Sequence, residues 1–127
     1  MSNGKTILVV DDEQDLADAV AALLRARGYQ VVVAADGKEG LEQAVAEPPD
    51  LVLLDYELPE MDGLEVIREL RSRETTRAVP VLLCTASKIG VGEIRKADGF
   101  LAKPYHEELL YEMVQRVLAG GRRAVSR

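Results

Sequence analysis

Apolar and polar positions along the chain form a repeating pattern of short apolar runs, each followed by a segment with helical spacing. Five runs have the length of strands: residues 6–10, 31–34, 51–54, 79–84 and 100–102. The run at 51–54 is unbroken, which is typical of a strand buried on both faces. Five strand–helix units in succession predict an α/β fold, with a parallel sheet covered by helices on both faces and joined by right-handed crossovers.

The predicted helices have boundary residues and apolar stripes. Gly28 is suited to end the first helix, and Asp36 is suited to cap the second. In the third helix we expect Arg68, Glu69 and Arg71 to face outward. The predicted core positions are Leu16, Val20, Leu23, Leu24, Leu41, Ala44, Val45, Leu64, Ile67, Leu70, Leu110, Met113, Val114, Val117 and Leu118.

The segment between the fourth and fifth predicted strands is poorly suited to form a helix. It contains Gly90, Gly92 and Gly99, and a glycine inside a helix costs about 1 kcal/mol relative to alanine. Only residues 93–97 have convincing helical character. We therefore predict a fourth helix that is short or disordered.

The chain has 127 residues, nearly half of them apolar, and this length and composition favour one folded domain. We place this domain at residues 1–119 and a flexible basic tail, or the stub of a linker, at 120–127. The net charge of −6 argues against binding of nucleic acid or an anionic membrane by the domain. The single cysteine, Cys84, and the absence of a signal-like or membrane-spanning stretch in the sequence lead us to expect a cytoplasmic protein.

Polar side chains follow four of the five predicted strands. Asp11 and Asp12 follow the first strand, Asp55 the third, Thr85 the fourth and Lys103 the fifth. Ligands of open α/β sheets bind at the carboxyl ends of the strands, so we expect these groups to converge on one rim. Three adjacent carboxylates repel one another unless a cation lies between them, and Mg²⁺ prefers such oxygen ligands. This pattern predicts that Asp55 is a nucleophile that accepts a phosphoryl group, assisted by Mg²⁺, Lys103 and Thr85.

These residues lie in four stretches that resemble the receiver domain of two-component response regulators. The stretches are residues 9–13 (VVDDE), 54–63 (LDYELPEMDG), 85–86 (TA) and 103–105 (KPY). The resemblance extends over residues 5–119 and implies a flavodoxin-like (βα)5 three-layer sandwich, with a parallel five-stranded sheet of order 2-1-3-4-5. It also implies a cis peptide bond between Lys103 and Pro104.

The resemblance implies a role for each site residue. Asp55 would take a phosphoryl group from a phosphohistidine of a sensor histidine kinase or phosphotransfer protein. Asp12, Asp55 and the backbone carbonyl of Glu57 would bind Mg²⁺, for which Mn²⁺ can substitute, and Asp11 would assist through water. Thr85 and Phe100 would form the switch, and the chain would accept and lose its phosphoryl group without being a turnover enzyme. The output partner or domain stays unidentified, and a homodimer through the fourth-helix face is compatible with the family, although that helix departs from the family pattern here.

Three alternatives to a phosphorylated receiver remain. A pseudo-receiver would use the same fold for protein binding without phosphotransfer; the weak fourth helix slightly favours it, whereas the complete set of site residues argues against it: Asp11, Asp12, Asp55, Thr85 and Lys103. A phosphatase with an aspartate nucleophile usually has an Asp-x-Asp pattern after its first strand, whereas Asp11 and Asp12 are adjacent here. A flavin carrier would need hydrogen-bond donors in that first loop, and acids there would repel phosphate.

With one histidine, His106, and one cysteine, a zinc site is disfavoured. The Asp62-Gly63 pair is interpreted as turn and capping chemistry.

Overall fold

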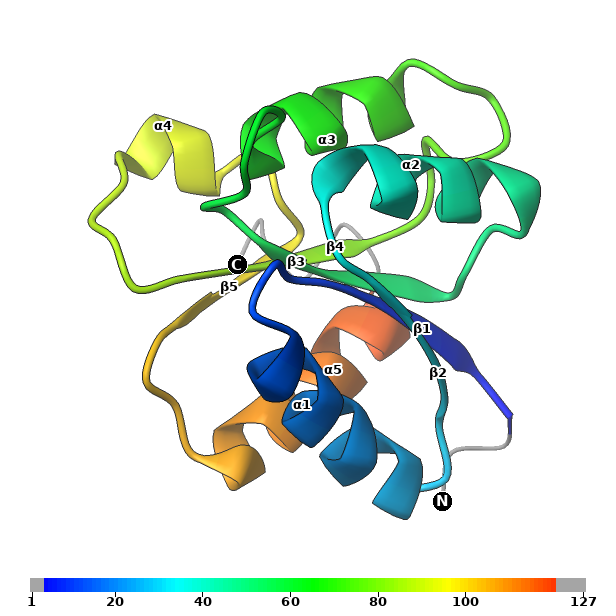
Figure 1. Ribbon diagram of the computed structural model, residues 1–127, viewed down its shortest axis with the longest axis vertical. Helices are drawn as coiled ribbons and strands as arrows, with labels where there is room; N and C mark the ends of the chain where they lie inside the picture. Colours follow the sequence, from blue (N-terminus) through cyan, green and yellow to red (C-terminus); the bar gives the residue numbers. More distant parts are fainter. Residues whose placement is uncertain (1–3, 121–127) are drawn as a thin grey trace.

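The computed structural model describes residues 4–120, which form a five-stranded parallel sheet in the order β2-β1-β3-β4-β5 (Figure 1). The strands are β1 (Thr6–Val10), β2 (Gln30–Ala34), β3 (Leu51–Asp55), β4 (Val81–Thr85) and β5 (Gly99–Ala102). The helices are α1 (Gln14–Ala26), α2 (Gly37–Ala46), α3 (Gly63–Arg71), α4 (Val91–Ile94) and α5 (Glu107–Gly120). The predicted flavodoxin-like fold and its strand order are thereby confirmed.

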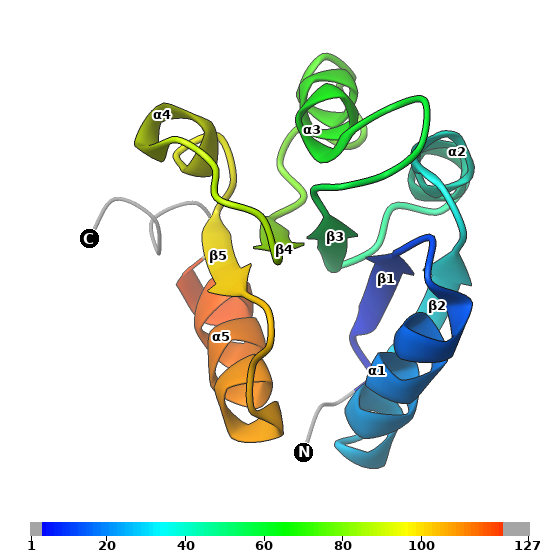
Figure 2. The same cartoon turned by 60° about the vertical axis from the view of Figure 1, so that its left-hand side comes forward.

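The sheet is the middle layer of three. Helices α1 and α5 cover one face, and α2, α3 and α4 cover the other (Figure 2). Strand β3 lies at the centre, and all five of its residues are buried, as its unbroken apolar run predicts. Within residues 4–120 no helix combines the length and the apolar character needed to cross a membrane. The predicted tail lies outside the described residues apart from Gly120, the last residue of α5.

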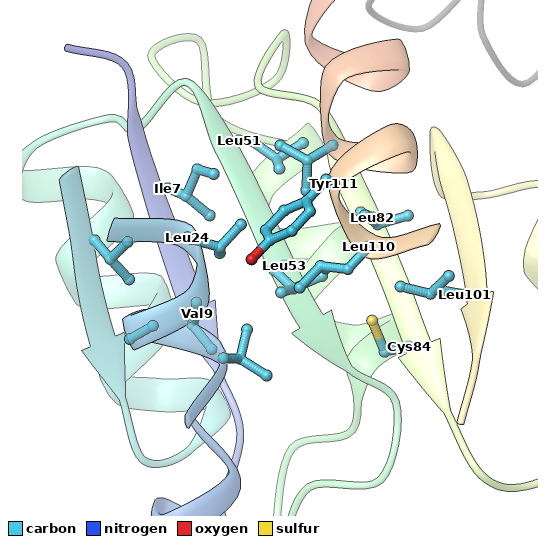
Figure 3. Packing of buried hydrophobic residues seen from close by; sticks show 14 of the residues in the cluster. Ile7, Val9, Leu24, Leu51, Leu53, Leu82, Cys84, Leu101, Leu110 and Tyr111 are labelled. Atoms are coloured by element: carbon cyan, nitrogen blue, oxygen red, sulfur yellow. The ribbon is translucent and has the colours of Figure 1, made fainter. Parts of the chain in front are cut away.

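Alternate residues of each strand enter two separate cores. Ile7 and Val9 of β1 pack toward α1 and α5, whereas Leu8 and Val10 pack toward α2 and α3. Figure 3 shows the first core, in which Tyr111 of α5 lies against the sheet. The Tyr111 hydroxyl donates a hydrogen bond to the backbone oxygen of Leu23 in α1 at 3.3 Å. Each fully buried leucine or valine stabilises such a core by about 1.5–3 kcal/mol.

Helical spacing places several core residues correctly and misplaces others. It predicts Leu16 and Val45 in the core, but 37% and 38% of these side chains are exposed. In α3 the half-buried Leu64 is at the edge, and Val66, which the prediction omitted, is buried. Gly63, at the start of α3, is itself buried against the end of β3, where an added Cβ would lie 2.9 Å from the Tyr56 Cα and 3.1 Å from the Asp55 backbone oxygen. A larger residue at this position would have to push α3 away from the sheet.

Capping residues behave as the sequence indicates. The Asp62 carboxylate accepts a hydrogen bond from the Glu65 backbone N–H at 3.0 Å, and the Glu65 carboxylate accepts one from the Asp62 N–H at 3.1 Å. Asp36 accepts one from the Glu39 N–H at 2.8 Å. Each such cap contributes about 1 kcal/mol to the stability of its helix. The bond between Lys103 and Pro104 is cis.

Helix α4 is a single turn, so the prediction of a short fourth helix is confirmed. The helical residues are Val91–Ile94 rather than the predicted 93–97, and none of the four is buried. Val91 is 67% exposed. The helix ends at Ile94, and four residues later the chain enters the interior at Asp98, whose carboxylate accepts a hydrogen bond from the Val81 N–H at 2.8 Å.

The sequence predicts that Arg71, at the end of α3, faces solvent, but the structure turns its side chain toward the α3–β4 connection. Its guanidinium donates hydrogen bonds to the Val79 oxygen at 2.8 Å, the Arg77 oxygen at 3.2 Å and the Asp98 carboxylate at 2.6 Å. These contacts join the α3–β4 connection to the start of β5. The partners lie six to 27 residues further along the chain, so helical phase alone could not reveal them.

Candidate functional site

The carboxyl ends of four strands form one rim of the sheet. Asp11 follows β1, Asp55 ends β3, Thr85 ends β4 and Lys103 follows β5. Asp55 pairs in register with Cys84, so Thr85 is one residue beyond it on the neighbouring strand. The structure therefore brings together the groups that the sequence assigns to one site.

Three carboxylates meet at this rim. One oxygen each from Asp11, Asp12 and Asp55 can be chosen so that all three lie within 4.8 Å of one another. Asp11 and Asp55 are 6% and 7% exposed, whereas Asp12 is exposed to solvent. Hard oxygen ligands with one open side suit Mg²⁺, which keeps several water molecules when it binds to protein. Among residues 4–120 this is the one group of three or more potential ligands found at such spacing.

Lys103 places a positive charge between two of the acids. Its Nζ lies 3.2 Å from Asp11 Oδ2 and 3.5 Å from Asp55 Oδ2. The Lys103 backbone N–H donates a hydrogen bond to the Thr85 backbone oxygen at 2.9 Å. This bond fixes the position at which the Lys103 side chain leaves the backbone, beside β4. Burial alone would lower the pKa of Lys103, but the charges of Asp55 and Asp11 outweigh burial and raise it. The side chain is therefore an ammonium ion at neutral pH.

Asp55 has an environment that disfavours its negative charge. Burial raises its pKa to about 6, although Lys103 and a 3.2 Å hydrogen bond from the Glu57 backbone N–H favour the charged form. The charge of Asp11 adds to the upward shift. Without a cation, about a tenth of this carboxyl would be protonated at pH 7 and more of it at lower pH, and a protonated carboxyl is a poor nucleophile.

The remaining predicted site residues lie around this centre. Thr85 is buried, and its hydroxyl oxygen accepts a hydrogen bond from the Ser87 N–H at 2.9 Å. Phe100 is half-buried against the core on the α3 side. Cys84 is buried beside the rim, and burial raises the pKa of its thiol, so it is an inert thiol. His106 is exposed and lies outside the acidic group.

Two features of the site have no simple signal in the sequence. The first is a hydrogen bond from the Ser87 hydroxyl to the Glu57 carboxylate, between residues 30 positions apart. The second is an apolar groove of about 410 Å³ beside the acids. Its lining residues are Leu16, Ala19, Val20, Leu23, Ala86, Lys103, Pro104 and Tyr105. The partial exposure of Leu16, which helical spacing places in the core, could have been noticed only once α1 was positioned.

The sequence matches a family model described as the response regulator receiver domain over residues 7–115. The chain belongs to this family. The receiver is 36% identical over 118 residues to the alkaline phosphatase synthesis transcriptional regulatory protein PhoP of Bacillus subtilis, covering 90% of this chain and 48% of that protein. It is 39% identical over 120 residues to the sensory transduction protein RegX3 of Mycolicibacterium smegmatis, covering 91% and 51%. The chain thus spans about half the length of the curated relatives it matches.

Solved receivers have the same fold. The chemotaxis response regulator CheY4 of Vibrio cholerae superposes with a TM-score of 0.85 and 31% identity, covering 91% of this receiver and 99% of CheY4. The receiver domain of the sensor histidine kinase PA1611 from Pseudomonas aeruginosa superposes with a TM-score of 0.82 and 32% identity, covering 91% and 98%. That structure has a magnesium ion coordinated in its active-site cleft.

Proposed function

We propose that this receiver accepts a phosphoryl group on Asp55 from a phosphohistidine of a sensor histidine kinase or phosphotransfer protein. The observation that carries the proposal is the position of the Lys103 ammonium, 3.5 Å from an Asp55 oxygen, beside three carboxylates whose oxygens meet within 4.8 Å. A structural ion pair at a strand end would need only one acid and one base. The additional carboxylates are explained when the site also holds a cation and a phosphoryl group.

The transfer itself needs only one nucleophile from this chain. A carboxylate oxygen of Asp55 attacks the phosphorus, the bond from phosphorus to the donor imidazole nitrogen breaks, and its electron pair leaves with the imidazole. Lys103 stabilises the charge on a phosphoryl oxygen, and the Thr85 hydroxyl donates a hydrogen bond to another. Water later attacks the acyl phosphate, which releases inorganic phosphate and restores the Asp55 carboxylate, so the chain is a switch rather than a turnover enzyme.

For the metal, we propose that Asp11, Asp12, Asp55 and the Glu57 backbone carbonyl hold Mg²⁺, with Mn²⁺ able to replace it. When bound, the ion neutralises the carboxylates and the incoming phosphate. The proposal is supported by the spacing of the three carboxylates and by the magnesium ion in the related PA1611 receiver domain. It also accounts for Asp12, which has no side-chain hydrogen bond among residues 4–120 and faces solvent.

We place the docking surface for the phosphate donor on the apolar groove beside Lys103. The groove runs along α1 and ends at the same lysine that contacts Asp55, so a protein bound there would hold its phosphohistidine over the nucleophile. For the response we assign Thr85 and Phe100 as switch residues, which alter a surface read by an output partner or domain. Relatives named as transcriptional regulators are about twice as long as this chain, which supports a separate output segment.

Acetyl phosphate with Mg²⁺, followed by intact-protein mass spectrometry, tests the proposal. Wild type should gain the mass of one phosphoryl group, Asp55→Asn should gain none, and EDTA should prevent the gain. Asp15→Asn, which changes an exposed acid of α1, is the matched control and should behave as wild type. A wild type that gains no mass, or a gain that persists in Asp55→Asn, would instead indicate a pseudo-receiver, the reading that the one-turn α4 favours.

A further inference from the structure

Among the described residues, one side-chain hydrogen bond joins the β4–α4 loop to the loop that follows β3. The Ser87 hydroxyl donates a hydrogen bond to the Glu57 carboxylate. The Ser87 backbone N–H donates to the Thr85 hydroxyl oxygen at 2.9 Å, and the Glu57 N–H donates to Asp55 Oδ1 at 3.2 Å. The two residues that touch each other are therefore both attached by their backbones to residues of the proposed phosphorylation site.

Few other contacts hold this segment. Between residues 86 and 97, the other described hydrogen bonds either stay within the segment or reach back to Thr85. Helix α4 has no buried residue, and an added Cβ on Gly92 would meet nothing within 4 Å. The far end is firmly fixed, because the Asp98 carboxylate binds both Arg71 and the Val81 N–H. The end near the site is thus held mainly by the Glu57–Ser87 hydrogen bond and by Ile89, which packs on the core.

A phosphoryl group on Asp55 would act on this hydrogen bond from both sides. It replaces the single charge of the Asp55 carboxylate with about two negative charges next to the Glu57 backbone, and the added charge repels the Glu57 carboxylate. It also offers acceptor oxygens to the Thr85 hydroxyl, which at present accepts a hydrogen bond from Ser87. A rotation of Thr85 toward those oxygens would therefore also shift the acceptor of the Ser87 N–H.

We propose that the Glu57–Ser87 hydrogen bond is a latch, which holds the β4–α4 loop in its unphosphorylated position and opens when Asp55 is phosphorylated. The closed latch is a property of the unmodified chain, whereas the opening step rests on the proposed function. Glu57 and Ser87 act as positioning residues, since neither side chain needs to touch the phosphoryl group.

Amide hydrogen exchange of the full chain, measured by mass spectrometry in Mg²⁺ buffer, tests the closed latch. In Ser87→Ala, exchange of residues 86–94 should be about threefold to tenfold faster than in wild type, as expected for the loss of one hydrogen bond. Glu57→Ala should have a similar effect, the double variant should add little to either, and Ser87→Thr should restore slow exchange. The control is Glu60→Ala, which removes an exposed glutamate of the same loop that has no side-chain hydrogen bond among the described residues.

The amides of β3 serve as the internal reference and should exchange equally slowly in every variant, which separates loss of the latch from a general loss of stability. Unchanged exchange in Ser87→Ala, or an equal rise in Glu60→Ala, overturns the latch.

The opening step is tested by repeating the comparison after phosphorylation with acetyl phosphate, with the modified fraction checked by mass. Wild type and Ser87→Ala should then exchange at the same rate in residues 86–94, because the contact is absent from both. If the difference between them persists at its original size, phosphorylation does not open the latch and the opening step is wrong. If wild type takes up no phosphoryl group, the proposed function and the opening step both fail, while the exchange of the unmodified variants still decides whether the latch holds the loop.

Discussion

Arg71 and Asp98 form an ion pair of 2.6 Å between the end of α3 and the residue before β5. The side chains are 18% and 3% exposed, so the pair is shielded from water. The Asp98 carboxylate also accepts a hydrogen bond from the Val81 N–H. The Arg71 guanidinium also donates hydrogen bonds to two backbone oxygens of the α3–β4 connection. These hydrogen bonds offset the cost of burying two charges, which an ion pair alone often fails to do.

We expect Asp98→Ala to lower the free energy of unfolding by about 3 kcal/mol, because it leaves the Arg71 charge and the Val81 N–H without their carboxylate partner. Urea denaturation followed by circular dichroism measures the change. Arg73→Gln is the control, since it removes an exposed ion pair with Glu69 at the same end of α3 and should cost less than about 1 kcal/mol. Equal losses in the two variants would show that burial of the Asp98 pair has no special effect.

Removal of the metal should be visible as a loss of thermal stability. An ion that binds only the folded chain, at a hundred times its dissociation constant, adds about 2.7 kcal/mol to the free energy of unfolding. Saturating Mg²⁺ should therefore raise Tm by several degrees, and EDTA should reverse the rise. Asp12→Asn should abolish most of the shift, whereas Asp15→Asn should leave it intact. An undiminished shift in Asp12→Asn would place the ion elsewhere.

The raised pKa of Asp55 predicts how stability depends on pH without metal. Its pKa is about 6 in the folded chain, above the ordinary value of 3.8, so the unfolded carboxyl ionises at lower pH. The contribution of Asp55 to stability is therefore complete below about pH 4 and is lost as pH rises through about 6. Asp55→Asn removes this loss and, after allowance for solvent screening at the rim, should stabilise the chain by about 1–2 kcal/mol at pH 7.5.

Urea titrations in EDTA at pH 4 and pH 7.5 measure that difference. The advantage of Asp55→Asn should disappear at pH 4, and Asp15→Asn should show no comparable gain at either pH. A stabilisation that is equal at both pH values would mean that it does not come from the ionisation of Asp55.

The apolar groove predicts separate effects on two phosphate donors. Leu16→Ser removes an apolar side chain from the groove, so transfer from a histidine-phosphorylated kinase that modifies wild type should slow about tenfold. Acetyl phosphate needs no docking surface and should modify the variant within about twofold of the wild-type rate. Leu109→Ser changes a similarly exposed leucine on α5 and is the control. Equal slowing with both donors would mean that Leu16→Ser disturbs the site itself.

Strand-level features of this fold were predictable because they follow from local chemistry. The unbroken run at residues 51–54 marks the central strand, and strand ends in a parallel sheet meet at one rim. That rule alone brings Asp11, Asp55 and Lys103 together, even though 92 residues separate the first from the last. The glycines of the α4 region likewise indicated a short helix, because their helix propensity is low in any fold.

Features that depend on tertiary contacts were not predictable in this way. Arg71 occupies an outward helical phase, yet the α3–β4 connection folds back over it and supplies backbone acceptors. Val45 fits the apolar stripe of α2 but is 38% exposed, because the stripe does not show how α2 is placed on the sheet. The Ser87–Glu57 contact joins two loops whose separation is set by the strands beneath them. In each case the surroundings of the side chain depend on the assembled fold rather than on residues nearby in the sequence.

The single turn of α4 limits how far a signal can travel. Four residues at about 1.5 Å each give a rod of about 6 Å, too short to act as a lever toward the outer edge of the sheet. We therefore expect a protein that reads the state of Asp55 through α4 to contact the loops around the carboxylates as well. Those loops also border the surface assigned to the phosphate donor, so donor and reader would take turns at this receiver rather than occupy it together.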